Sequence, residues 1–139
     1  MASADPAMPW QLLDHTADVR LEVEAASWPG LLEEAAAAFG GFVGGGQTGR
    51  TEARPVTLSG SDPVEVWVRW WRTLLRLWTV ERVLPVRAEM LGSDPRVLAV
   101  PAAALDLSRC EDIKAVTWHA ASVEQAAPGC WRGTIVLDV

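Results

Sequence analysis

The stretch LLDHTADVRLEVEA, residues 12–25, decides the fold at the start of the chain, because it joins two apolar runs through a short polar segment. After this segment the residues alternate, so that Val19, Leu21 and Val23 point one way and charged side chains point the other. A period of two residues is typical of a strand with one buried face. The apolar run before the polar segment suits a first strand, and the stretch therefore predicts a β-hairpin.

The polar segment of this hairpin holds two aspartates and a histidine within five residues, Asp14, His15 and Asp18. Short polar side chains of this kind stabilise turns by accepting hydrogen bonds from nearby backbone amides. The same carboxylates could instead converge on a hard cation, which prefers several oxygen ligands. An inward-pointing His15 would shift the preference toward a transition metal. The spacing leaves both interpretations open.

Two helices are predicted downstream of the hairpin. Ser27 is a suitable N-cap for the first helix, which the glycine pair 40–41 should end. Asp62 is a suitable N-cap for the second helix, with Glu65 completing a capping box. The second helix should run to about Val80.

The other regular elements are predicted to be strands. They cover residues 56–60, 84–90, 96–101, 113–124 and 130–139, and residues 43–55 are expected to form a flexible loop. The order lacks a regular alternation of strands and helices, which argues against a parallel sheet. The sequence therefore predicts an α+β fold, with two helices packed on one face of a largely antiparallel or mixed β-sheet.

Length and composition suit one domain, over residues 9–139, preceded by a disordered tail over residues 1–8. No apolar run approaches the roughly 20 residues that a membrane-spanning helix needs, and the first residues do not resemble a signal peptide. A cytoplasmic protein without membrane contact is expected. Cys110 and Cys130 lack metal-site spacing. The net charge of −6 disfavours non-specific binding of nucleic acid across the whole surface.

Asp138 is an unusual residue, because it ends an otherwise apolar strand with a carboxylate. It could be solvated at the chain end. If its strand lies beside the first strand, Asp138 could instead meet Asp14 or Asp18 at one edge of the sheet. Carboxylates gathered in this way repel one another unless a cation or a shared proton intervenes.

Several basic and aromatic residues are further candidates for function. Lys114 is the only lysine of the chain, and it could extend into solvent or reach toward a phosphate or the acidic residues. Arg69, Arg72 and Arg76 share one face of the second helix. This face could be solvated, or it could bind RNA or an acidic protein. Trp70, on the flank of that helix, could be exposed at an interface.

Four segments together resemble the archease family over nearly the whole chain. They are the hairpin with DHTAD, the second helix DPVEVWVRWWRTLLRLWTVE, the segment IKAVTWH and the closing TIVLDV. The chain departs from the family pattern at two points and keeps the acidic residues. Family members often carry Asn-Glu where this chain has Arg72-Thr73, and a histidine often precedes IKAVT where this chain has Cys110 nearby.

The resemblance implies an accessory protein of the GTP-dependent RNA ligase that acts in tRNA splicing and RNA repair, without a catalytic cycle of its own. Such a protein promotes guanylylation of the ligase and multiple turnover, and contacts RNA only indirectly. The resemblance assigns a divalent cation, calcium or alternatively magnesium, to Asp14, Asp18 and Asp138. It places Lys114 and His15 at the partner's active site.

Two alternatives to this function stay open from the sequence. The acidic residues could serve a stand-alone metal-dependent phosphohydrolase. The tryptophan-rich second helix could serve a protein-binding adaptor or chaperone.

Overall fold

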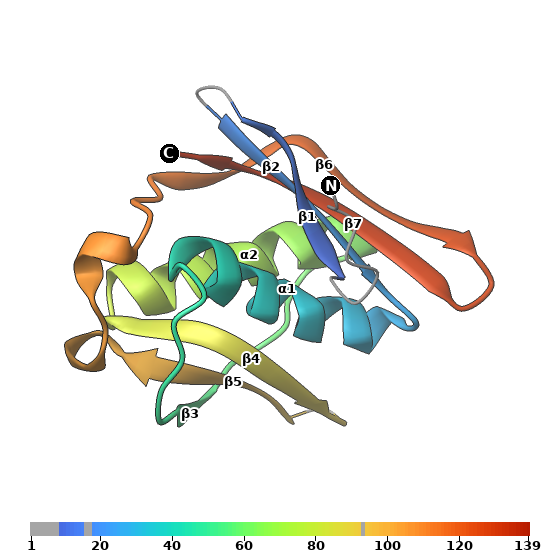
Figure 1. The fold of residues 1–139 in the computed structure, drawn as a ribbon. Coiled ribbons are helices and arrows are strands. Elements are labelled where there is room, and N and C mark those ends of the chain that lie inside the picture. Colours follow the sequence, from blue (N-terminus) through green and yellow to red (C-terminus); the bar gives the residue numbers. More distant parts are fainter. Residues whose placement is uncertain (1–8, 16–17, 93) are drawn as a thin grey trace.

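The computed structural model describes residues 9–15, 18–92 and 94–139, and the predicted tail over residues 1–8 lies outside these ranges. Two helices lie between two β-sheets (Figure 1). The strands are β1 (Trp10–His15), β2 (Asp18–Ala25), β3 (Glu52–Pro55), β4 (Val83–Leu91), β5 (Asp94–Pro101), β6 (Ala115–Ala127) and β7 (Cys130–Asp138). The helices are α1 (Trp28–Val43) and α2 (Pro63–Thr79), and two short 3-10 helices, η1 (Ala102–Ala104) and η2 (Leu107–Arg109), precede β6.

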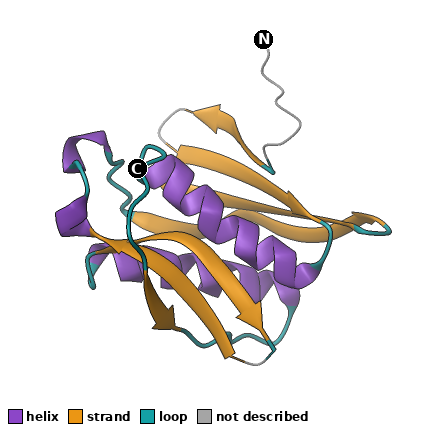
Figure 2. Ribbon diagram, turned by 60° about the horizontal axis from the view of Figure 1, so that its bottom comes forward, coloured by secondary structure: helices purple, strands orange, loops and turns teal. Residues whose placement is uncertain are grey.

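Every strand pairing that the structure describes is antiparallel. One sheet has the order β1-β2-β7-β6 and the other has the order β3-β5-β4. A view turned by 60° shows both helices between these layers (Figure 2). The α+β class is therefore confirmed, with two helices packed against antiparallel sheets. The structure adds that the strands divide into two sheets, one on either side of the helix layer.

The hairpin at the start of the chain is confirmed. Strand β2 follows the predicted alternation, since Val19, Leu21 and Val23 are fully buried while Asp18 and Arg20 are exposed. β2 pairs with β1 on one side and with β7 on the other. This places β7 inside the four-stranded sheet, which explains why its residues 133–137 are all buried.

Helix α1 begins as predicted but extends past the glycine pair 40–41, so the expected end was wrong. The hydroxyl of Ser27 accepts a hydrogen bond from the Gly30 amide at 3.0 Å, and the helix continues to Val43. A Cβ on Gly40 would lie 2.6 Å from the carbonyl oxygen of Pro85, and one on Gly41 would lie 2.6 Å from the Trp10 ring. The two glycines allow close packing of neighbouring elements.

Helix α2 has the predicted bounds to within one residue. Its N-cap Asp62 accepts a hydrogen bond from the Glu65 amide at 2.9 Å, and the Glu65 carboxylate accepts one from the Ser61 amide at 2.7 Å. The prediction that Trp70 is exposed was wrong. Its side chain is 1% exposed and donates a hydrogen bond to the Leu32 carbonyl at 3.0 Å. A helix between two sheets buries a wide arc of its surface, and Trp70 lies within that arc.

The third strand was predicted too late in the chain. Residues 52–55, expected in a loop, form the edge strand β3 by pairing with β5, whereas residues 56–60 form no strand. Pro55 is tolerated because an edge strand leaves one side of its backbone unpaired. Pro85 likewise lies on an edge strand, β4. Among the described residues, neither helix could span a membrane.

Candidate functional site

The register of two adjacent strands brings Asp18 and Asp138 together. They are direct partners in the pairing of β2 with β7, although they stand 120 positions apart in the sequence. Directly opposed residues of antiparallel strands share a face of the sheet, with Cβ atoms about 4.5–5.5 Å apart. Asp18 is exposed and Asp138 is half-buried. Two carboxylates therefore meet on the outer face of the four-stranded sheet.

The other two predicted residues of this site, Asp14 and His15, end strand β1. Their backbones pair with Arg20 and Val19 of β2, after an irregularity in register that follows Leu12. Their side chains, and residues 16–17 of the turn, lie outside the part of the chain that the structure describes. The structure thus positions two of the three predicted acidic side chains.

Lys114 lies directly before strand β6, next to the same corner of the sheet. Its backbone amide donates a hydrogen bond of 2.7 Å to the carbonyl oxygen of Asp138, and its residue is exposed. The following residue, Ala115, is the β6 partner of Asp138. The backbone therefore places Lys114 beside the acidic pair, and the ammonium group can extend into solvent from there.

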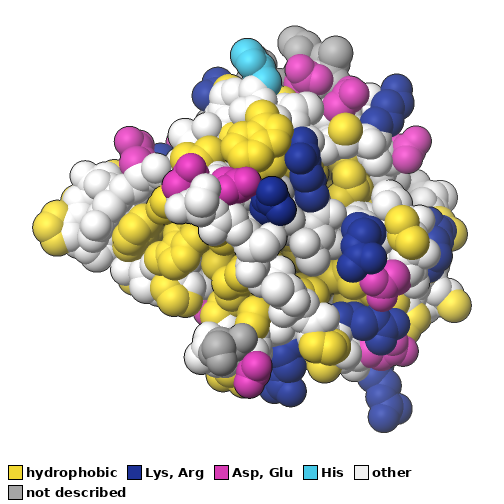
Figure 3. All heavy atoms as spheres, turned by 180° about the vertical axis from the view of Figure 1, so that it is seen from behind, with side chains coloured by type: hydrophobic (Ala, Val, Ile, Leu, Met, Phe, Trp, Pro, Cys, Tyr) yellow, Lys and Arg dark blue, Asp and Glu magenta, His cyan; other side chains and the backbone are white. Residues whose placement is uncertain are grey.

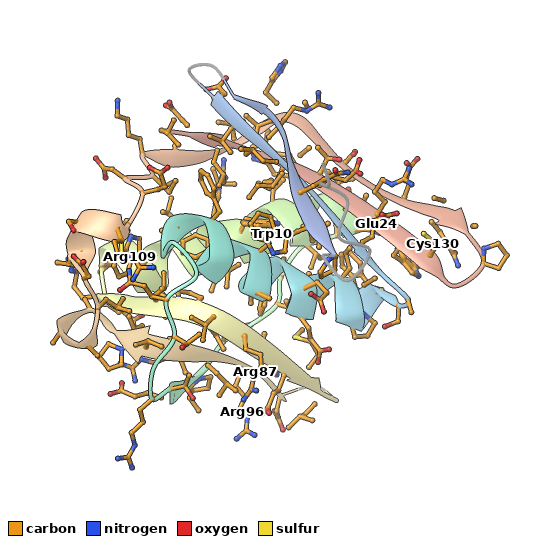
Figure 4. The ribbon with its side chains drawn as sticks, in the orientation of Figure 1. Trp10, Glu24, Arg87, Arg96, Arg109 and Cys130 are labelled. Atoms are coloured by element: carbon orange, nitrogen blue, oxygen red, sulfur yellow. The ribbon has the colours of Figure 1, made fainter. Side chains whose placement is uncertain are left out.

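The opposite end of the same sheet face shows how this protein compensates charge elsewhere. Arg132 of β7 contacts three glutamates, with an Nη2–Oε2 distance of 3.2 Å to Glu24, 3.5 Å to Glu124 from Nη1, and 4.0 Å to Glu22 from Nε. The hydrogen bond and charge of Glu24, followed by Glu22, raise the pKa of Arg132. Figure 4 shows Glu24 and Cys130 close together at this end.

The acidic pair has no such compensation among the described side chains. None of the ion pairs found there includes Asp18 or Asp138. Oxygen donors of this kind suit Ca²⁺ or Mg²⁺, and opposed carboxylates repel each other without a cation. Within the described part of the chain, however, no three His, Cys, Asp or Glu side chains are grouped closely enough to hold a metal ion. Carboxylate oxygens suit a hard cation, and the structure describes two of the three predicted acidic side chains.

The three arginines of α2 are exposed, but their surroundings differ. Arg69 pairs with Glu65 at 3.0 Å, and Arg76 pairs with Glu81 at 3.7 Å. Arg72 instead donates to the Val116 carbonyl, at 3.3 Å from Nη2.

The exposed tryptophan of the chain lies beside Arg72. The guanidinium carbon of Arg72 is 5.8 Å from the ring centre of Trp118, which is 47% exposed. The sequence interpretation missed this residue and selected Trp70. One available signal was its neighbour His119, which made a fully buried strand segment less plausible.

Comparisons with known proteins agree over nearly the whole chain. The model of the archease protein family (MTH1598/TM1083) matches residues 10–139. Protein archease of Methanosarcina barkeri is 26% identical over 140 residues, which cover 94% of this chain and 95% of that protein.

Two solved structures share the fold. The crystal structure of an archease from Thermotoga maritima, described as a possible chaperone, has a TM-score of 0.68 and 20% identity, over 93% of this chain and 96% of that one. The solution structure of protein 1598 from Methanobacterium thermoautotrophicum has a TM-score of 0.65 and 16% identity, over 95% and 99%.

Proposed function

Because the chain belongs to the archease family, we propose that it is a non-catalytic accessory protein of a GTP-dependent RNA ligase. In this function it promotes guanylylation of the ligase and multiple turnover during tRNA splicing and RNA repair. The observation that carries the proposal is the direct pairing of Asp18 with Asp138, which are two of the three acidic residues that the family resemblance selects.

We call the end of the sheet that carries Asp14, Asp18 and Asp138 the acidic corner. Each of its residues has a role in this proposal. Asp18 and Asp138, together with Asp14, would hold one divalent cation, calcium or magnesium. A bound cation would supply positive charge and orientation for phosphate groups, which are the main contributions a protein makes to phosphoryl-type transfer. Lys114 starts beside Asp138 and can reach the partner's nucleotide phosphates, while His15 stands at the end of β1.

The acidic corner would act in trans, on the partner's active site. Both carboxylates lie on the outer face of the sheet, and Asp18 is exposed, so a second protein can approach them. Prior placement of charge lowers the cost of organising the reacting groups. The protein would therefore increase the rate at which each ligase molecule is charged, without forming a covalent intermediate itself.

The test is a ligation assay with the ligase of the same organism at limiting enzyme concentration. Asp18→Ala and Asp138→Ala should each abolish stimulation while the far-ultraviolet circular dichroism spectrum stays unchanged. Asp94→Ala is the matched control, since it removes an exposed carboxylate from the other sheet and should stimulate fully. Full stimulation by both acidic-corner variants would refute the proposed role of the site.

The same preparation distinguishes the alternative functions. Hydrolysis of a phosphoester by the purified protein alone, lost in Asp138→Ala, would indicate a stand-alone phosphohydrolase. The description of the Thermotoga maritima structure as a possible chaperone favours a second candidate, a protein-binding chaperone. That candidate predicts suppressed aggregation of a client protein, unaffected by loss of either carboxylate.

A further inference from the structure

We infer that Trp118 and Arg72 anchor a protein partner that presents an apolar side chain next to a carboxylate. The inference rests on the proposed function, because it assigns the surface by which this protein binds the ligase. The two residues come from different elements, strand β6 and helix α2, and meet where β6 packs against α2.

The exposure of Trp118 separates it from the other tryptophans of the chain. Trp67, Trp70, Trp71 and Trp78 are buried in the core, and Trp10, Trp28 and Trp131 are half-buried. Trp118 alone is exposed, at 47%. An indole left in water in the free protein gains by burial when a partner covers it.

An irregular backbone keeps Trp118 at the surface. Thr117 pairs with Val136 and Ser122 pairs with Thr134, so residues 118–121 of β6 lie opposite Ile135 alone. Ala120, within this bulge, has a φ of 59°. A non-glycine residue in the left-handed region is strained, and bulges often redirect a side chain near a functional site. The bulge interrupts the alternation that would otherwise fix the direction of the Trp118 side chain.

Arg72 supplies a charge that remains uncompensated within the described part of the chain. Its guanidinium group is positioned by the Val116 carbonyl and by the Trp118 ring, whereas Arg69 and Arg76 are paired with glutamates. A positioned guanidinium group has further N–H donors, which suit a carboxylate. The expected partner surface therefore offers an acidic side chain opposite Arg72.

The charges of this surface favour a protein over RNA. Figure 3 shows the face seen from behind, where Lys and Arg side chains are interspersed with Asp and Glu side chains. Binding of phosphates requires an excess of positive charge along a surface, but two of the three arginines of α2 are paired with glutamates and the chain carries a net charge of −6. Tryptophan and arginine are the residues that most often dominate protein–protein binding energy.

Trp118 lies a short distance along strand β6 from the residue that pairs with Asp138. Ala115, the β6 partner of Asp138, precedes Trp118 by three residues, which corresponds to roughly 10 Å along a strand. Trp118 contacts α2 on the helix side of the sheet, whereas Asp138 lies on the outer face, so a partner bound at Trp118 reaches the acidic residues around the free edge of β6. Docking and stimulation would use neighbouring but separate groups.

Titration of the ligase with wild-type and variant protein separates these two roles. Both binding to the ligase, by calorimetry, and stimulation of ligation are measured against protein concentration. Trp118→Ala and Arg72→Glu should each raise the dissociation constant and the concentration for half-maximal stimulation by about tenfold or more. The maximal stimulation should stay at the wild-type level. Arg72→Lys should show a smaller increase, since it keeps the charge without the planar group.

The matched control is Leu91→Ala, which removes an exposed apolar side chain (57% exposed) from the other sheet and should bind and stimulate as the wild type does. Unchanged thermal unfolding of the variants, read by circular dichroism, shows that they fold. Asp138→Ala should show the reverse of the anchor variants, with normal binding and no stimulation at any concentration.

Three results would overturn the inference. The first is wild-type binding by both Trp118→Ala and Arg72→Glu. The second is a lower maximal stimulation at an unchanged dissociation constant, which would place Trp118 in the stimulated step. The third is binding of single-stranded RNA without ligase that Trp118→Ala abolishes. A wild-type protein that binds the ligase through Trp118 but does not stimulate it would refute the proposed function alone.

Discussion

At the scale of single residues, the opposed carboxylates of Asp18 and Asp138 are the most unusual pair in the sheet, because like charges directly opposite each other destabilise paired strands. The Arg132 cluster at the opposite end of the same sheet face differs from this pair, because each of its acidic side chains has a basic partner. The contrast indicates that selection for stability does not explain the acidic corner.

A cation should relieve this repulsion. We expect Ca²⁺ or Mg²⁺ to stabilise the wild-type protein, by about 2.7 kcal/mol at a concentration a hundred times the dissociation constant. Asp18→Asn and Asp138→Asn should reduce that gain, and in the absence of divalent ions each should be slightly more stable than the wild type. Thermal unfolding across a series of calcium and magnesium concentrations measures both effects. An equal response of wild type and variants would exclude a cation at this corner.

Gly133 of β7 has no room for a side chain, because the ring of Trp67 packs against it. A Cβ at this position would lie 2.5 Å from Cζ2 of the buried Trp67 ring. Gly133→Ala should therefore cost about 1–3 kcal/mol of unfolding free energy, measured by urea denaturation. The same substitution in a Trp67→Phe background should cost less, because the smaller ring leaves room for the methyl group. Additive costs would show that the contact is not the cause.

At the scale of elements, the start of α2 couples stability to pH. The amide and then the hydroxyl of Ser61, with a further contribution from Arg69, lower the pKa of Glu65 from its ordinary value of 4.5. A carboxylate whose pKa falls on folding contributes stability above its unfolded pKa and loses it as the pH falls through the lower folded value.

Glu65→Gln should therefore make the free energy of unfolding less dependent on pH. The wild type should be more stable than this variant near neutral pH, and the difference should shrink as the pH falls below about 4.5. Thermal unfolding at a series of pH values between neutrality and 3 measures the difference. A difference that stays constant through this range would contradict the pKa shift. Asp112→Asn, an exposed change in a loop, serves as the control.

The elements also show what local sequence could predict. The hairpin, both helix starts and four of the later strands follow from alternation and capping, which are properties of neighbouring residues. The end of α1 and the position of β3 do not, because close packing against Pro85 and Trp10 and pairing with β5 decide them. The prediction that Trp70 is exposed was wrong for the same reason, since its burial depends on a second sheet that the residue pattern did not reveal.

The candidate site was partly predictable. The family resemblance selected Asp18, Asp138 and Lys114, and the composition of β7 marked Asp138 as unusual. The register that opposes Asp18 and Asp138 could not be read from the sequence, because β7 could equally have paired beside β1. Trp118 was not selected, since the bulge of β6 breaks the alternation on which strand interpretation relies.

At the scale of the whole molecule, both sheets share one helix layer. Helix α1 packs on β4 of one sheet and on β2 of the other, and α2 packs on β4 and β6. The buried residues of both sheets and both helices form one core cluster. Loss of either sheet would therefore expose apolar side chains of the two helices, which also pack on the other sheet.

This shared core predicts a single cooperative unfolding transition. Tryptophan fluorescence, to which α2 contributes four of the eight tryptophans, and far-ultraviolet circular dichroism should give the same urea midpoint. Leu74→Ala, at a fully buried position of α2, should lower both midpoints together, by an amount equivalent to about 2–5 kcal/mol. Two separated transitions would show that the sheets unfold independently.

The bulge of β6 also limits strand pairing between neighbouring molecules of this protein. β6 is an outer strand of its sheet and spans 13 residues, so its free edge offers backbone groups to any strand of a neighbouring molecule. The misaligned residues 118–121 divide that edge into two short lengths, which are poor templates for continued pairing. An irregularity that exposes Trp118 thus also guards the protein against edge-to-edge aggregation.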